Sequence, residues 1–82
     1  MKKENIKAGM FVKVKSEKKC EELGWDFDEN YFDRDFCGQK VEVVSNVHNT
    51  EWENDTCYDS VNVEYGSLTQ TIPIHLLKKL KE

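Results

Sequence analysis

The stretch FCGQKVEVVSNV, residues 36–47, contains the most β-prone run of this sequence and decides how the rest is interpreted. Val41 and Val43 are two residues apart, so their side chains point to the same face of a strand. Val44 interrupts this alternation, which indicates either a bulge or a strand that is buried on both faces. Gly38 opens the run. We therefore expect residues 36–47 to form the central strand of a small β domain.

Other segments show the alternation of apolar and polar residues that is typical of half-buried strands. They are residues 10–15 (MFVKVK), 58–65 (YDSVNVEY) and 68–72 (LTQTI). Pro73 ends the last of these ladders because proline has no amide donor. The tail from residue 74 predicts either a helical turn with a short strand or a C-terminal helix. Both of these alternatives place Leu77 and Leu80 in the core. Between the predicted strands, the polar stretch 48–56 predicts a turn.

A short helix is predicted between the first strand and the acidic middle of the chain. Ser16 is a good helix N-cap, and Gly24 supplies a stop after the helix formers EKKCEEL. We expect two turns, with Cys20 and Leu23 facing the core.

Length and composition indicate one small domain that spans residues 1–82. With 82 residues, of which 38% are hydrophobic, the chain can form only a small core. It contains no apolar run of the length that a signal peptide or a membrane-spanning helix needs, so we expect a cytoplasmic protein without a membrane partner. The three cysteines are few and widely spaced, which predicts reduced thiols rather than a disulfide scaffold.

The net charge of −4 conceals a strong asymmetry along the chain. Residues 1–19 carry seven lysines against two acids, a net charge of +5. Residues 20–66 carry thirteen acids against Arg34 and Lys40, a net charge of −11, and residues 67–82 return to +2. If the two ends meet in space, the molecule has a basic pole and an acidic body.

The acidic-aromatic loop, residues 25–36 (WDFDENYFDRDF), is the main candidate for a functional surface. Exposed Trp and Tyr side chains are frequent binding anchors, and a rim of acids steers a basic partner. The alternative interpretation is that the aromatics fill the core while the acids keep the loop solvated. The candidate partner-binding residues are Trp25, Asp26, Phe27, Asp28, Tyr31, Asp33, Asp35 and Trp52.

Patterns for catalysis, metals and cofactors are missing from the sequence. Asp26-x-Asp28-x-Asn30 resembles the start of a calcium loop, but Tyr31 replaces the required glycine and Cys37 the final glutamate. The cysteines and histidines are not at chelating spacing, and there is no phosphate-binding glycine loop. We expect a protein that is not an enzyme and has no catalytic residue, cofactor or metal.

Two segments resemble the SH3-like barrel. GQKVEVV (38–44) is similar to the strand after its first long loop, and IPIHLLKKL (72–80) is similar to its ending, where a 3₁₀ turn leads into the last strand. The resemblance implies a mainly β protein, a single SH3-like β-barrel of about five strands with a short helix in the first long loop. The first strand FVKVKS and Leu76 depart from peptide-binding SH3 domains, so a groove for proline-rich ligands is not expected.

The chain also resembles a loosely defined group of small phage and prophage proteins. The similar segments are GMFVKVKS (9–16), EELGWDFDEN (21–30) and CGQKVEV (37–43). Together with the acidic-aromatic loop, this resemblance implies a non-catalytic protein-binding module, a phage-encoded modulator or inhibitor of a host protein. The expected partner is a protein with a basic surface. A structural role inside a virion is a further possibility.

The alternative hypothesis is nucleic-acid binding through a pole of lysines from both ends of the chain. Its candidate residues are Lys13, Lys15, Lys78 and Lys79. Against it, arginine is almost absent and the sequence shows no stacking motif beside the lysines.

Overall fold

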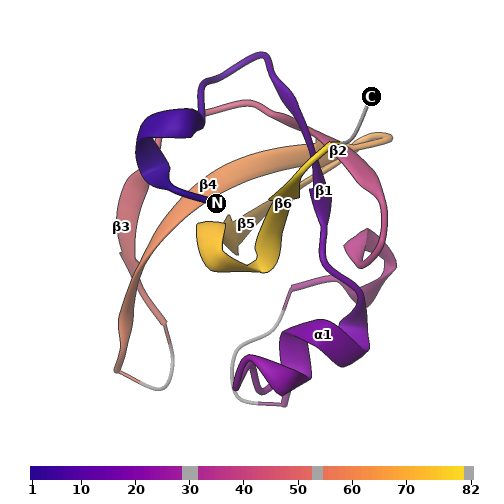
Figure 1. The fold of residues 1–82 in the computed structure, drawn as a ribbon, viewed down its shortest axis with the longest axis vertical. Helices are drawn as coiled ribbons and strands as arrows, with labels where there is room; N and C mark the ends of the chain where they lie inside the picture. The colour runs from indigo at the N-terminus through magenta and orange to yellow at the C-terminus, as the bar shows by residue number, and fades with distance from the viewer. Residues whose placement is uncertain (29–31, 53–54, 81–82) are drawn as a thin grey trace.

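One curled antiparallel sheet dominates the computed structural model, which describes residues 1–28, 32–52 and 55–80 (Figure 1). In this part of the chain the strands are β1 (Phe11–Val14), β2 (Lys40–Val43), β3 (His48–Glu51), β4 (Cys57–Tyr65), β5 (Leu68–Pro73) and β6 (Leu77–Lys79). The helical elements are α1 (Glu17–Glu22) and three 3₁₀ turns, η1 (Lys3–Asn5), η2 (Arg34–Phe36) and η3 (Ile74–Leu76). The prediction of a mainly β protein is confirmed.

The long strand β4 organises the sheet. Its neighbours are β3 and then β2 along one edge and β5 along the other, because Ser60 pairs with both His48 and Pro73 while Val63 pairs with both Val43 and Gln70. The order continues from β2 to β1 and β6, so strands from the two ends of the chain lie side by side (Figure 1).

The stretch that decided the sequence interpretation forms an inner strand, but a short one. β2 pairs with β1 on one side and β4 on the other, and Val41 and Val43 are buried. Val44 is 41% exposed, so the strand is not buried on both faces. After Val43 the chain leaves the ladder and returns to the same edge of β4 as β3.

The prediction of a polar turn over 48–56 is wrong, because residues 48–51 form the strand β3. With β3, the described residues form six strands, where about five were predicted. All four side chains of β3 are exposed or half-buried. Alternation of apolar and polar residues marks a strand only when one of its faces is buried. Neither face of β3 is buried, so its sequence shows no such alternation. It is held by its register with β4, in which Asn49 lies opposite Asp59 and Thr50 opposite Tyr58.

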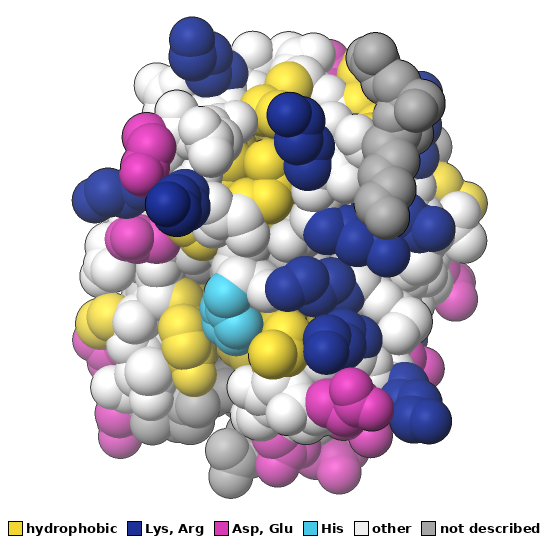
Figure 2. Space-filling model, in the orientation of Figure 1, with side chains coloured by type: hydrophobic (Ala, Val, Ile, Leu, Met, Phe, Trp, Pro, Cys, Tyr) yellow, Lys and Arg dark blue, Asp and Glu magenta, His cyan; other side chains and the backbone are white. Residues whose placement is uncertain are grey.

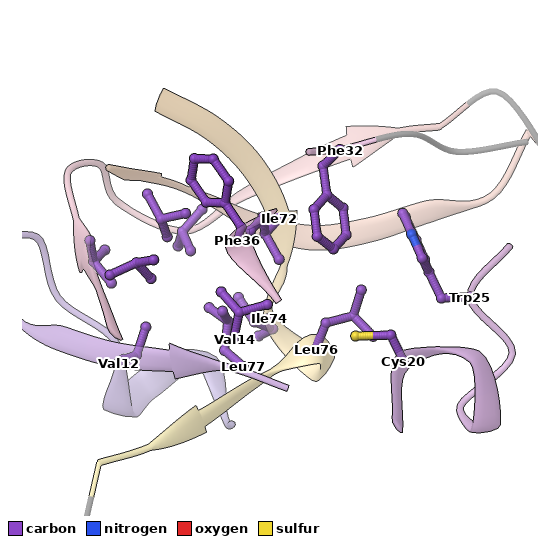
Figure 3. Close-up of a cluster of buried hydrophobic side chains, with 14 of the residues drawn as sticks. Val12, Val14, Cys20, Trp25, Phe32, Phe36, Ile72, Ile74, Leu76 and Leu77 are labelled. Atoms are coloured by element: carbon purple, nitrogen blue, oxygen red, sulfur yellow. The ribbon is translucent and has the colours of Figure 1, made fainter. Parts of the chain in front are cut away.

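The core fills the concave side of the sheet, where side chains from the strands and from the loop after α1 point toward one another (Figure 3). Its fully buried members include Val12, Val14, Cys20, Phe36, Val41, Val43, Val61, Val63, Ile72, Leu76 and Leu77. Burial of each large apolar side chain contributes about 1.5–3 kcal/mol. Leu77 was predicted here, whereas Leu80 is only half-buried.

Helix α1 begins and ends at the expected signals. The Ser16 hydroxyl accepts a hydrogen bond from the Lys19 amide at 3.2 Å, and Gly24 follows with a φ of 90°, a conformation that glycine adopts without strain. Cys20 is buried, but Leu23 is 43% exposed, so its predicted inward orientation is wrong. The helix ends one residue before Leu23, and Trp25 enters the core instead.

Among the described residues, no helix has the length and apolar character to cross a membrane.

Candidate functional site

The aromatics of the acidic-aromatic loop are mostly buried. Trp25 is 3% exposed and Phe27 is 5% exposed, and Phe32 and Phe36 are buried as well. Trp25 and Phe27 are therefore not exposed, and the alternative interpretation, in which the aromatics of the loop fill the core, holds for these rings. The rings close the open end of the curled sheet, where they bury more apolar surface than they could as exposed anchors.

Trp25 is the centre of an aromatic cluster that joins four parts of the chain. Its ring packs edge-on against Trp52 after β3 (5.0 Å between centroids) and against Tyr58 on β4 (5.7 Å). Phe32 and the His75 imidazole of η3 lie 5.9 and 6.3 Å from it. Trp52, Tyr58 and His75 remain half-buried, so one side of this cluster reaches the surface. Edge-to-face contacts of this kind add about 0.5–1.5 kcal/mol each beyond burial.

The two indole groups of this cluster lack hydrogen-bond partners. Nε1 of Trp25 and Nε1 of Trp52 are buried, and neither has an acceptor among the described residues. A buried donor without an acceptor costs about 1–3 kcal/mol, so the packing of the rings has to offset this penalty.

Beside the cluster lies a shallow depression of about 370 Å³, which we call the loop pocket. Its lining residues are Glu21, Gly24, Trp25, Asp26, Phe27, Asp28 and Arg34. Two buried rings thus adjoin three carboxylates and one guanidinium. The pocket gathers negative charge beside rings that are almost fully buried, and the carboxylates are the groups that favour a cationic side chain.

Arg34 shows how a cation is held at this pocket. Its guanidinium carbon lies 5.0 Å from the centroid of the Phe27 ring. One of its nitrogens lies 3.0 Å from the Glu17 carboxylate, and another lies 3.9 Å from Asp28. The pair with Glu17 is about half exposed and contributes only about 0.2–1 kcal/mol, whereas Asp28 is 95% exposed and its pair contributes less.

Two of the predicted carboxylates also shape the loop backbone. Oδ1 of Asp26 accepts a hydrogen bond from the Asp28 amide at 2.8 Å, and Oδ1 of Asp33 accepts one from the Asp35 amide at 2.9 Å. The second bond caps η2. These aspartates fold their own turns in the manner of Asx turns, and their charge is left exposed or half-buried.

The structure thus brings part of the predicted set together. Trp25, Asp26, Phe27 and Asp28 line the loop pocket, and Trp52 packs on Trp25. Asp33 caps the N-terminus of η2, and Asp35 lies within η2, so the two stand on either side of Arg34 in the chain. Tyr31 lies outside the described residues. Whether any of these residues binds a partner stays a prediction.

Sequence reasoning missed Glu21, Arg34, Tyr58 and His75. Arg34 had a detectable signal, because it is the only arginine of the chain and stands within the acidic block. Tyr58 and His75 had none, because β4 and η3 bring them to Trp25 from distant parts of the sequence.

The lysines that were expected to form a basic pole divide into separate places. Lys13 on β1 lies opposite Lys78 on β6 and also opposite Lys40 on β2; we call these three the lysine row. Lys15 turns away, and its Nζ donates a hydrogen bond to the His75 carbonyl at 2.8 Å. Lys79 lies opposite Val12, at the end of β6. Lysine and arginine side chains gather in the middle and upper part of one face, while acids are densest along its lower edge (Figure 2).

Titratable groups near the core have shifted pKa values. Burial, with a contribution from Lys15, lowers the pKa of His75 below its usual 6.5. Burial raises the pKa of the Cys20 thiol, and burial together with Cys20 raises the pKa of Cys37 to about 12. Both thiols therefore stay protonated at neutral pH, when they are poor nucleophiles and poor metal ligands.

Within residues 1–28, 32–52 and 55–80, no three His, Cys, Asp or Glu side chains lie close enough together to hold a metal ion. Comparison with protein-family models, curated proteins and solved structures finds no match for this chain.

Proposed function

We propose that this chain is a non-catalytic protein-binding domain whose loop pocket receives a lysine or arginine side chain of a partner with a basic surface. The observation that carries the proposal is the lining of the pocket. The carboxylates of Glu21, Asp26 and Asp28 adjoin the buried rings of Trp25 and Phe27. A cation is attracted by the carboxylates, whereas the rings, 3% and 5% exposed, leave little aromatic surface for it.

The position of Arg34 supports this proposal. The guanidinium uses the Phe27 ring and the Glu17 carboxylate at the same time. Among the described residues, Glu21 and Asp26 make no ion pair within 4.0 Å, so their charges are available to a second cation. The net charge of −11 over residues 20–66, to which the carboxylates of the pocket belong, would also attract a basic protein.

We propose in addition that the curled sheet is an SH3-like barrel. The element order supports this assignment: an opening strand, a long loop with α1, the antiparallel strands β2, β4 and β5, and then η3 and β6, which returns to β1. In line with the resemblance to phage and prophage proteins, the domain would act as a modulator of a host protein.

The test is a titration of the ¹⁵N-labelled domain with a synthetic peptide rich in arginine and lysine, followed by NMR. The variant Asp26→Asn/Asp28→Asn removes two charges from the pocket but keeps an Oδ1 atom that can accept the amide of residue 28. We expect peptide affinity to fall by about three- to tenfold, since two partly exposed ion pairs are lost. Chemical-shift changes in the wild type should centre on the residues that line the loop pocket.

The matched control is Glu42→Gln/Glu64→Gln, which changes the net charge equally. These two residues pair across β2 and β4, outside the pocket. The control should bind the peptide within about twofold of the wild type. Equal losses in both variants, or no saturable binding by the wild type, would overturn the proposal.

A further inference from the structure

The lysine row lies on the outer face of the sheet, away from the loop pocket. Residues directly opposite each other on antiparallel strands point to the same face, with their Cβ atoms about 5 Å apart. Lys13 therefore shares a face with both Lys78 and Lys40. The alternate residues Val12 and Val41 are buried, which places the row on the convex, solvent side. The backbone positions of three lysines thus cross three adjacent strands within about 10 Å, or two strand spacings.

This arrangement is unfavourable in the free protein. Like charges directly opposite each other destabilise a sheet, and the row contains two such pairs. Among the described residues, none of the three lysines makes an ion pair within 4.0 Å. The nearest acids in the ladder are Glu42, which lies opposite Phe11, and Glu64, which lies opposite Glu42. A bound polyanion would relieve the repulsion among the lysines.

An exposed aromatic ring stands beside the row. Phe11 lies two residues before Lys13 on β1, so it points to the same outer face. It is 49% exposed, unlike the rings around the loop pocket. The Nζ atom of Lys40 lies 4.9 Å from the centroid of its ring. Glu42 lies opposite Phe11 in the register, so the ring stands between a cation and an acid, and its exposed half can accept a nucleic-acid base.

We propose that this surface binds single-stranded nucleic acid, with phosphates along the lysine row and a base stacked on Phe11. Single strands fit better than duplexes because only an unpaired base can reach the ring. The lysines that gather on one face in Figure 2 would extend the positive potential around the strand. This surface shares no residue with the loop pocket, so the inference stands independently of the proposed function.

Fluorescence anisotropy with a labelled oligothymidylate of about 12 nucleotides, a length within the usual site sizes of small barrels, tests the proposal. If three lysines neutralise phosphates, log K should fall against log salt concentration with a slope of about −2, since single strands lose about 0.7 per contact. The variant Lys13→Gln/Lys78→Gln should reduce this slope to about −0.7 and weaken binding at ~50 mM salt by tenfold or more. It should fold at least as well as the wild type, because it removes like-charge pairs.

Two further variants separate the row from general attraction to positive charge. Lys18→Gln/Lys19→Gln makes the same charge change on α1, where both lysines are exposed, and should retain binding within about twofold. Phe11→Leu keeps an apolar residue but removes the stacking surface, and should weaken oligonucleotide binding by about tenfold.

The outcomes that overturn the proposal are distinct. No anisotropy change at low salt would remove it, as would equal losses in the row variant and the α1 control. The proposal also fails if Phe11→Leu binds as well as the wild type, or if duplex DNA or vesicles with anionic lipid compete as well as the oligonucleotide. The surface would then attract polyanions without selecting single strands. The variant Asp26→Asn/Asp28→Asn should leave oligonucleotide binding intact, which distinguishes this result from failure of the loop pocket.

Discussion

The loop pocket and the lysine row hold their charges in opposite ways. At the pocket, the carboxylates line the same depression as two buried rings, Asp26 folds its own turn, and Asp28 lies near Arg34. In the row, strand register places the lysines side by side without an ion pair among the described residues, and Lys40 also lies over the Phe11 ring. A change to the buried rings beneath the pocket should therefore disturb the fold, whereas a change of Lys13 or Lys78 should alter the charge of the surface.

The largest effect should come from the framework beneath the pocket. Trp25→Ala removes a buried ring and should lower the free energy of unfolding by about 3–5 kcal/mol, measured by urea denaturation. Trp52→Ala, at a half-buried ring, should cost clearly less. If both variants lose the same stability, or if Trp25→Ala loses less than about 1 kcal/mol, the pocket does not rest on a packed core.

Thiol reactivity provides the next test of that framework. In the native protein, iodoacetamide should modify exposed Cys57 at least about tenfold faster than Cys20 or Cys37, as followed by mass spectrometry. Cys37 has its pKa raised to about 12, so folding favours its protonated form, and this contribution to stability is lost as pH rises from about 9 toward 12. In urea the three thiols should react at similar rates. Equal rates in the native protein would contradict the packing around α1 and η2.

His75, the histidine of the aromatic cluster, should give a smaller effect, in which the free energy of unfolding depends on pH. Because burial and Lys15 lower the pKa of His75, the unfolded chain binds a proton at higher pH than the folded one. The free energy of unfolding should therefore fall as pH drops from about 6.5 to the folded-state pKa. His75→Gln should flatten the profile in this range, as measured by thermal unfolding across pH. A profile that the substitution leaves unchanged would assign the effect to other groups.

The smallest effect belongs to the lysine row. Lys13→Glu places a carboxylate opposite both Lys78 and Lys40, and should raise the free energy of unfolding by about 0.2–1 kcal/mol per pair. The same variant should abolish oligonucleotide binding. Lys18→Glu on α1 serves as the charge-matched control. A loss of stability in Lys13→Glu would show that the row is held by contacts other than register.

The contrast between the two regions also explains what sequence reasoning could predict. The inward valines of β1 and of the second half of β4 follow from alternation, because these segments have one buried face, whereas β5 buries Ile72 and Pro73 in succession. The burial of Trp25 and Phe27 depends on β4 and η3, which lie far along the chain, so local patterns suggested exposure instead. The meeting of Lys13 with Lys78 was expected from charge, but its partner Lys40 and the nearby Phe11 required the β1–β2 register.

The pairing of β1 with β6 determines when, during synthesis and folding, the lysine row can be completed. Lys13 and Lys78 are 65 positions apart, so their strands meet only after most of the chain has been made. At synthesis rates of about 5–20 residues per second, the second lysine follows the first by roughly 3–13 s. Closure of such distant strands is also among the slow steps of folding. During this interval Lys13 stands without its neighbour from β6, and the complete basic surface belongs only to the finished domain.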